Sequence, residues 1–140
     1  MSLVRNLIDF DDQIIMYAGF VLVRSECKAP DFHFDWNDNC NNNAFTFITP
    51  IIHPFDGANL LYKDNEGENK KYTYEFGRGI CFGSKFIHST DIGVSSSPSI
   101  LLSINFGTDR MEYWGDISKT TANQGKFYRL PNGTFFHSDF

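Results

Sequence analysis

Residues 31–36 read Asp31-Phe32-His33-Phe34-Asp35-Trp36, and a second histidine stands in Lys85-Phe86-Ile87-His88-Ser89-Thr90, 55 residues after the first. Residues i and i+2 of an extended strand point to one face, so the side chains of His33 and Asp35 can reach one metal ion. Two imidazoles and one carboxylate form the facial triad that holds non-haem Fe(II) and leaves coordination positions open. His33, Asp35 and His88 are therefore candidate metal ligands, with His88 expected on a strand lying opposite the His-x-Asp strand.

The rest of the chain has the pattern of short strands separated by turns. Aromatic residues make up 16% of the sequence, and 15 of them are Phe, which favours pleated, half-buried strands over helices. The apolar stretch 14–24 predicts one or two strands broken near Gly19, and Pro50 predicts an edge or a bulge. Ser95-Ser96-Ser97-Pro98 is expected to be a loop. Turn signals separate further expected strands at 45–52, 57–63, 72–76, 79–83, 86–90 and 99–106.

This pattern predicts one all-β domain over residues 1–140, a sandwich or a barrel. The last expected strand, 99–106, alternates regularly between two faces. Ile100, Leu102, Ile104 and Phe106 fall on one face, and Ser99, Leu101, Ser103 and Asn105 fall on the other. We expect the inner face to carry His33, His88, Ser99, Ser103 and Asn105. Ile100, Leu102 and Ile104 pointing into the pocket instead would mean a register error of one residue, because such a slip turns every side chain over.

Charge and cysteine content exclude several classes of partner. The 12 Lys and Arg residues against 17 Asp and Glu give a formal net charge of −5, which disfavours nucleic acid and anionic membranes. The three cysteines, Cys27, Cys40 and Cys81, match no zinc or Cys-x-x-Cys spacing. The N-terminal residues lack the apolar segment of a signal peptide. We therefore expect reduced thiols and a cytoplasmic protein without nucleic-acid or membrane partners.

Several short motifs occur in a characteristic order. They are His33-Phe34-Asp35-Trp36, Phe45-Thr46-Phe47-Ile48-Thr49-Pro50, Gly57-Ala58-Asn59-Leu60, Phe76-Gly77-Arg78-Gly79-Ile80-Cys81-Phe82 and then His88. This succession resembles the 2-oxoglutarate/Fe(II)-dependent dioxygenases of the prolyl-hydroxylase and AlkB-like kind, over roughly residues 14–106. The resemblance implies a double-stranded β-helix, or jelly roll, with the metal inside one mouth. It also implies Fe(II) and 2-oxoglutarate as cofactors of an oxygenase that hydroxylates a small-molecule or peptidyl substrate.

The chain departs from that family at the expected binding site for the distal carboxylate of 2-oxoglutarate. Relatives place an Arg or Lys about ten residues after the distal His, or a little later, whereas the region Val94–Ser99 holds neither. Ser99, Ser103 and Asn105 could donate hydrogen bonds to a carboxylate but cannot neutralise it.

A replacement charge could come from Arg24, which lies nine positions before His33. Strand alternation would place Glu26 on the same face, so a structural Arg24–Glu26 pair is the alternative. Arg78 and Arg110 are weaker candidates, each more readily explained as a solvated surface charge.

Two classes of function therefore stay open. The complete His-x-Asp…His set favours an oxygenase, whereas the missing basic residue favours a catalytically inactive or metal-free jelly-roll binding module. A cupin-type site is less consistent with the sequence, since residues 33–43 lack its His-x-His and following Glu. His53 and His137 are attributed to a turn and to the tail. The aromatic tail, 107–140, is expected to form a covering hairpin or a homo-oligomer contact.

Overall fold

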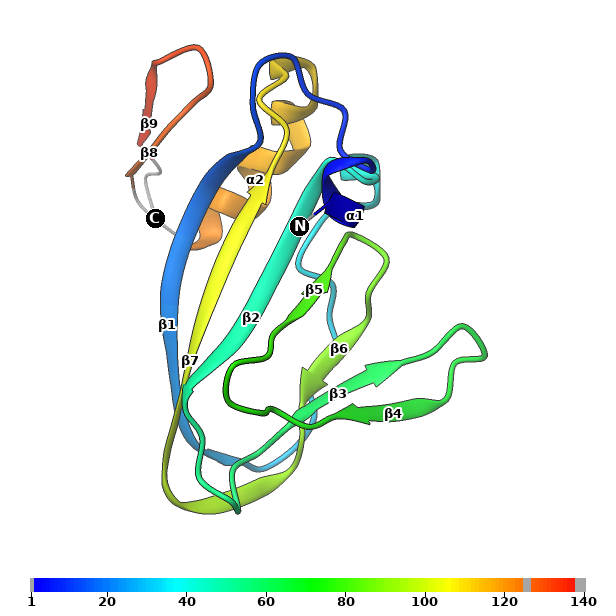
Figure 1. Ribbon diagram of the computed structural model, residues 1–140, viewed down its shortest axis with the longest axis vertical. Coiled ribbons are helices and arrows are strands. Elements are labelled where there is room, and N and C mark those ends of the chain that lie inside the picture. Colours follow the sequence, from blue (N-terminus) through cyan, green and yellow to red (C-terminus); the bar gives the residue numbers. More distant parts are fainter. Residues whose placement is uncertain (1, 125–126, 138–140) are drawn as a thin grey trace.

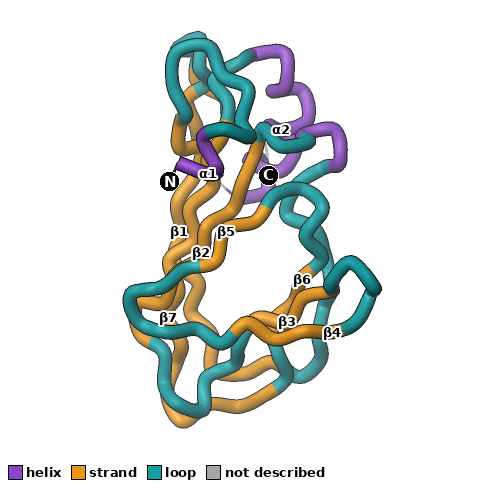
Figure 2. Tube along the Cα trace, turned by 45° about the vertical axis from the view of Figure 1, so that its right-hand side comes forward, coloured by secondary structure: helices purple, strands orange, loops and turns teal. Residues whose placement is uncertain are grey.

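The computed structural model describes residues 2–124 and 127–137. Two antiparallel sheets face each other (Figure 1, Figure 2). Residues of both sheets line a cavity. The larger sheet has the strand order β1-β7-β2-β5, the smaller one β4-β3-β6, and β8 and β9 form a separate hairpin. The strands are β1 (Ile15–Cys27), β2 (Ala44–Ile52), β3 (Leu60–Lys63), β4 (Asn69–Tyr72), β5 (Ile80–Phe82), β6 (His88–Thr90), β7 (Gly93–Gly107), β8 (Phe127–Arg129) and β9 (Phe135–His137). The helices are α1 (Ser2–Arg5), the short 3-10 helices η1 (Asp38–Cys40) and η2 (Met111–Tyr113), and α2 (Trp114–Gln124). None of the helices in these described ranges is long and apolar enough to cross a membrane.

The all-β prediction is confirmed, and most expected strands lie within a few residues of their predicted places. The bulge expected at Pro50 is also present. β5 pairs with β2 only as far as Ile48, and the register with β7 shifts between Pro50 and Ile52. The proline, which has no N–H, therefore lies where one ladder has ended and the other is irregular.

Strand pairing overrode local composition in two places. β1 is a single strand through Gly19, one of the two alternatives that the sequence left open, since β7 pairs with it along almost its whole length. Residues 95–98, expected as a loop, lie inside β7, where the register against β1 shifts between Arg24 and Glu26. These residues form a bulge in β7, so their turn-forming composition does not end the strand.

The tail contains a helix that the strand-based analysis did not predict. Trp114, Ile117 and Thr121 of α2 are all buried, and their spacing of three and four residues places them on one helical face. Trp114 packs its ring edge-on against Tyr17, at a centroid distance of 5.0 Å. α2 thus closes one end of the larger sheet, and a second core cluster around Ile48 lies between the sheets.

Gly107, the last residue of β7, lies directly against the backbone of Asn43. A Cβ atom added there would clash with the Asn43 carbonyl oxygen, which belongs to the main chain and cannot rotate away. Gly107→Ala should therefore lower the free energy of unfolding by about 1–3 kcal/mol. Gly93, the first residue of the same strand, is the matched control, because no heavy atom lies within 4 Å of its added Cβ. Urea unfolding curves that shift equally for Gly107→Ala and Gly93→Ala would contradict this account.

Asp109 holds the segment that leads into β1. Its carboxylate accepts hydrogen bonds from the backbone N–H groups of Asp11, Asp12 and Gln13, at 2.8, 2.8 and 2.9 Å. Desolvation by burial alone would raise the pKa of Asp109, but the hydrogen bonds from these N–H groups outweigh it, so the pKa falls below its ordinary 3.8.

The lowered pKa predicts how acid changes the stability. The unfolded chain binds a proton at Asp109 more readily than the folded one, so the carboxylate contributes stability above the unfolded pKa and loses it as the pH falls. Asp109→Asn should therefore be less stable than the native chain at neutral pH, and the difference should shrink below about pH 4. Thermal unfolding across that range measures it, and a difference that does not depend on pH would contradict the assignment.

Candidate metal centre

His33 and His88 are direct neighbours across an antiparallel backbone pair. The N–H of His33 donates to the carbonyl of His88 at 2.9 Å, and the N–H of His88 donates back at 3.0 Å. Residues that exchange both hydrogen bonds carry their side chains on the same face. The two rings accordingly lie 4.6 Å apart between centroids. The second histidine therefore comes from the strand β6, which pairs directly with the His-x-Asp segment.

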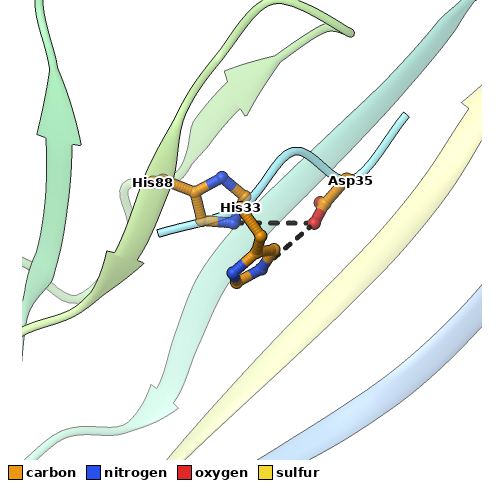
Figure 3. Close-up of side chains that lie close together, drawn as sticks. All are labelled: His33, Asp35 and His88. Atoms are coloured by element: carbon orange, nitrogen blue, oxygen red, sulfur yellow. Dashed lines mark ion pairs between the residues drawn. The ribbon is translucent and has the colours of Figure 1, made fainter. Parts of the chain in front are cut away.

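Asp35 completes a three-residue cluster with these histidines (Figure 3). Its Oδ1 lies 3.7 Å from Nε2 of His33 and 3.6 Å from Nε2 of His88. The three ligand atoms all lie within 4.8 Å of one another. Two atoms bound to one ion at metal–ligand distances of about 2.0–2.2 Å lie at most about 4.4 Å apart, a limit that both Asp35–histidine distances meet. The described residues thus contain a possible His/Asp/His metal site.

Both imidazoles are oriented by carbonyl oxygens of their own chain segments. Nδ1 of His33 lies 2.7 Å from the carbonyl of Asp31, and Nδ1 of His88 lies 3.2 Å from the carbonyl of Phe86. A carbonyl only accepts hydrogen bonds, so each Nδ1 must carry the proton. In the neutral ring this leaves a lone pair on Nε2 at the cluster, which is the tautomer that a metal ligand needs.

The second carboxylate oxygen of Asp35, Oδ2, accepts a hydrogen bond that fixes the side chain. The Thr46 hydroxyl, 1% exposed on β2, donates to Oδ2 of Asp35 at 2.7 Å. The indole N–H of Trp36 donates to the same hydroxyl oxygen at 3.0 Å. Because the hydroxyl has one proton and its oxygen already accepts from Trp36, that proton is available to Asp35. Because Thr46 bonds to Oδ2 of Asp35, the other carboxylate oxygen, Oδ1, remains available on the side of the two histidines.

The cluster is buried on one side and open on the other. The side chains of His88 and Asp35 are 6% and 15% exposed, whereas that of His33 is 51% exposed. Burial lowers the pKa of His88 below its ordinary value, even though the Asp35 carboxylate favours the protonated ring. His88 is therefore neutral near pH 7, the protonation state that binds a metal.

A cavity of about 310 Å³ lies beside the cluster, and its walls come from both sheets. His33, Asp35 and His88 line it, as do Arg24, Ser99 and Ser103. Asn105 does not line the cavity: it is 1% exposed and pairs in register with Thr46 further along β7. The inward direction of the two serines follows the predicted strand alternation.

Arg24 does not pair with Glu26, the alternative suggested by the sequence. Its Nη1 donates to the hydroxyl of Thr90 on β6 at 2.7 Å, and Glu26 lies 3.9 Å from Lys28 instead. The alternation that would have put Arg24 and Glu26 on one face is interrupted by the bulge between them.

The two weaker basic candidates lie in ion pairs that do not belong to the cavity wall. Arg78 contacts Glu75 at 3.0 Å, and Arg110 pairs with Asp9 and, at 2.8 Å, with Asp11. Both arginines therefore have structural partners on the surface.

Four residues near the site were not singled out from the sequence. Thr46 and Thr90 hold Asp35 and Arg24, and Tyr74 lines the cavity. His53, attributed to a turn, has its Nδ1 3.1 Å from the hydroxyl of cavity-lining Ser99. Their positions in the sequence gave no signal, because Thr46 and Thr90 reach the site through pairing of distant strands and His53 and Tyr74 lie just beyond the ends of β2 and β4.

No family model matches the sequence, and no curated protein matches it either. A solved structure described as a non-heme monooxygenase, ThoJ–Ni complex, is similar in fold, with a TM-score of 0.60 at 11% sequence identity. The match covers 78% of this chain and 49% of that one, so the chain spans about half the length of the structure that it matches. The likeness concerns the fold and agrees with the predicted jelly roll.

The hydrogen bond from Thr46 to Asp35 can be tested without knowing the reaction. Thr46→Val keeps the shape but removes the donor, so Asp35 loses the partner of Oδ2. We expect divalent-metal affinity to fall about 10- to 100-fold, the usual effect of losing a group that orients a metal ligand. Thr46→Ser keeps the hydroxyl and is the matched control. Anaerobic calorimetric titration with Fe(II) measures both, and equal affinities for Thr46→Val and Thr46→Ser would refute the role of the hydroxyl.

Proposed function

We propose that the chain is a non-haem Fe(II) oxygenase that uses 2-oxoglutarate to hydroxylate a small-molecule or peptidyl substrate. The observation that carries the proposal is the arrangement of His33, Asp35 and His88, whose ligand atoms converge within 4.8 Å at the wall of a cavity. Two neutral imidazoles and one carboxylate suit Fe(II).

The residues present fit that metal. Nε2 of His33, Nε2 of His88 and Oδ1 of Asp35 would hold it, since their other polar atoms are already engaged by Asp31, Phe86 and Thr46. Fe(II) bound by such a triad supplies oxidising chemistry with O₂ and a 2-oxo acid, while the protein binds and orients the reactants. The half-exposed His33 leaves the centre accessible from one side.

Arg24 is the residue that we assign to the co-substrate's distal carboxylate. It is the one Lys or Arg among the residues that line the described cavity. Its hydrogen-bond partner Thr90 stands two residues after His88 on β6, and residues i and i+2 of a strand share a face. The guanidinium is thereby directed to the same side of β6 as the metal ligand. Ser99 and Ser103 add hydroxyl groups from β7.

The cavity also limits the substrate. The cavity has a volume of about 310 Å³. Once 2-oxoglutarate is bound in it, the remaining space suits a small molecule or one side chain of a peptide. Phe20, Leu22 and Leu101 give part of its wall an apolar character. Such a wall suits an unactivated C–H group better than a highly charged one.

Anaerobic titration of the Fe(II)-loaded protein with 2-oxoglutarate tests the assignment directly. The proposal predicts a metal-to-ligand charge-transfer band, and Arg24→Ala should raise the apparent Kd of the acid by about tenfold or more, because a charge-assisted hydrogen bond is lost. Arg78→Ala removes an arginine that is paired with Glu75 away from the cavity, and it should leave the Kd unchanged.

Two results would separate the parts of this proposal. An unchanged Kd in Arg24→Ala would exclude Arg24 from co-substrate binding while leaving the metal centre intact. Failure of the Fe(II)-loaded native chain to bind 2-oxoglutarate would instead favour a jelly-roll binding module or a different co-substrate.

A further inference from the structure

One part of the cavity wall carries polar side chains that are not among the three candidate metal ligands. Arg24 of β1 and Ser99 of β7 are direct partners in the ladder of the larger sheet, so their side chains share a face. Both line the cavity, and so does Tyr74, which follows β4. Together with His53, whose ring reaches Ser99, these residues define what we call the Arg24 cluster.

Tyr74 brings a buried hydroxyl group to the Arg24 cluster. The residue is 7% exposed, and its ring lies edge-on to the ring of His53 at a centroid distance of 5.4 Å. Its backbone N–H donates to the side chain of Asn59 at 3.0 Å. Within residues 2–124 and 127–137, however, no group forms a hydrogen bond with its hydroxyl. A buried hydroxyl without a partner is unfavourable, so a bound molecule that accepts its proton would be stabilised.

The charge state of Tyr74 suits the binding of an anion. Burial, and to a smaller extent the neighbouring Tyr72, raises the pKa of Tyr74 far above its ordinary 10.0, while the guanidinium of Arg24 partly lowers it. The phenol therefore keeps its proton at neutral pH and can donate it in a hydrogen bond. The influence of Arg24 also means that the guanidinium lies within electrostatic range of the phenol oxygen. A fixed positive charge and a neutral donor thus lie close together.

His53 controls the proton of Ser99. Nδ1 of His53 lies 3.1 Å from the hydroxyl oxygen of Ser99, which is 4% exposed. Gly57 leaves room for this pair, because a Cβ atom added there would lie 2.7 Å from both Oγ of Ser99 and Cε1 of His53. The Ser99 hydroxyl has one proton, which goes either to His53 or to an acceptor in the cavity. When His53 carries its proton on Nδ1 and donates it to Ser99, the Ser99 proton is available to the cavity.

We propose that Arg24, Tyr74 and Ser99 bind one carboxylate group together, and that His53 is a positioning residue that directs the Ser99 proton towards it. The guanidinium supplies the charge, and the two hydroxyls add hydrogen bonds, which are stronger to an ionised acceptor than to a neutral one. A carboxylate has enough lone pairs to accept from all three. An anion is favoured over a cation because none of the four residues in the Arg24 cluster is acidic at neutral pH.

The position of the Arg24 cluster relative to the metal ligands is consistent with a diacid. Thr90, to which Arg24 donates, stands two residues after His88 on β6, which corresponds to roughly 6.6 Å along a strand. A short diacid with one end at the candidate metal centre could therefore place its other carboxylate at the Arg24 cluster. That this diacid is 2-oxoglutarate rests on the proposed function, whereas the carboxylate site itself needs no metal.

NMR titration of the metal-free, isotope-labelled full chain with glutarate tests the carboxylate site alone, because glutarate is a five-carbon diacid without the 2-oxo group that would chelate a metal. Tyr74→Phe removes only the hydroxyl and should raise the Kd of glutarate about tenfold, the usual effect of losing a hydrogen bond to a charged group. Tyr72→Phe is the matched control. Its ring lies 5.7 Å from that of Tyr74 between centroids, but Tyr72 is not among the residues that line the described cavity, so the Kd should not change.

The role of His53 is tested by the same titration. His53→Phe keeps an aromatic ring beside Tyr74 but removes Nδ1, and it should raise the Kd roughly threefold to tenfold. His53→Asn returns an N–H donor near the place of Nδ1 and should restore most of the affinity. In a Ser99→Ala background His53→Phe should have little further effect, because both residues act through one hydrogen bond. Independent, additive effects would overturn the positioning role and leave His53 as a packing residue.

Titration of the Fe(II)-loaded chain with 2-oxoglutarate separates this inference from the proposed function. A metal-free native chain that does not bind glutarate, or equal affinities of Tyr74→Phe and Tyr72→Phe, would overturn the carboxylate site whether or not the loaded chain binds 2-oxoglutarate. Glutarate binding that depends on Tyr74, without a charge-transfer band in the loaded chain, would support the carboxylate site and contradict the proposed function.

Discussion

The reciprocal backbone pair between His33 and His88 is the interaction on which the candidate centre depends. It is a single bridge between a loop and β6, and further contacts support it on each side. β6 is paired with β3, where His88 stands opposite Tyr62. The hydroxyl of Ser89 accepts a hydrogen bond from the N–H of Asp31 at 2.7 Å. The His-x-Asp segment therefore extends the smaller sheet, and both imidazoles belong to that sheet.

The carboxylate is tied to the other sheet. Asp35 is held by Thr46 of β2, and Thr46 in turn accepts from Trp36, which is packed in the core cluster at the α2 end. A metal bound by the three ligands would thus join the two sheets across the cavity. Arg24 and Thr90 make a second polar link between the sheets, from β1 to β6. Metal binding is accordingly expected to stabilise the packing of the sheets as well as to create a reactive centre.

The alternation of β7 gives the larger sheet two different faces. Ser99 and Ser103 turn hydroxyl groups into the cavity, with Leu101 between them. Ile100 and Leu102 necessarily point the other way, because successive side chains of a strand lie on opposite faces. The cavity wall and the opposite face of the larger sheet are thus specified in part by one strand. A substitution that shifted the register of β7 would expose the serines and bury the isoleucine, which would affect both faces at once.

Particular residues show which features of the fold and of the candidate site follow from the sequence alone. The periodicity of 99–106 determined which side chains of β7 share a face, and the aromatic, turn-punctuated composition determined an all-β chain, because both depend on local geometry. The spacing in His33-x-Asp35 likewise identified two groups able to share an ion. The identity of the partners was decided only by the tertiary structure: that His88 is a paired neighbour, that Thr46 holds Asp35, and that Arg24 bonds to Thr90 rather than Glu26. These contacts join residues 11 to 66 positions apart, and strand pairing and a bulge, neither of which leaves a local pattern, bring them together.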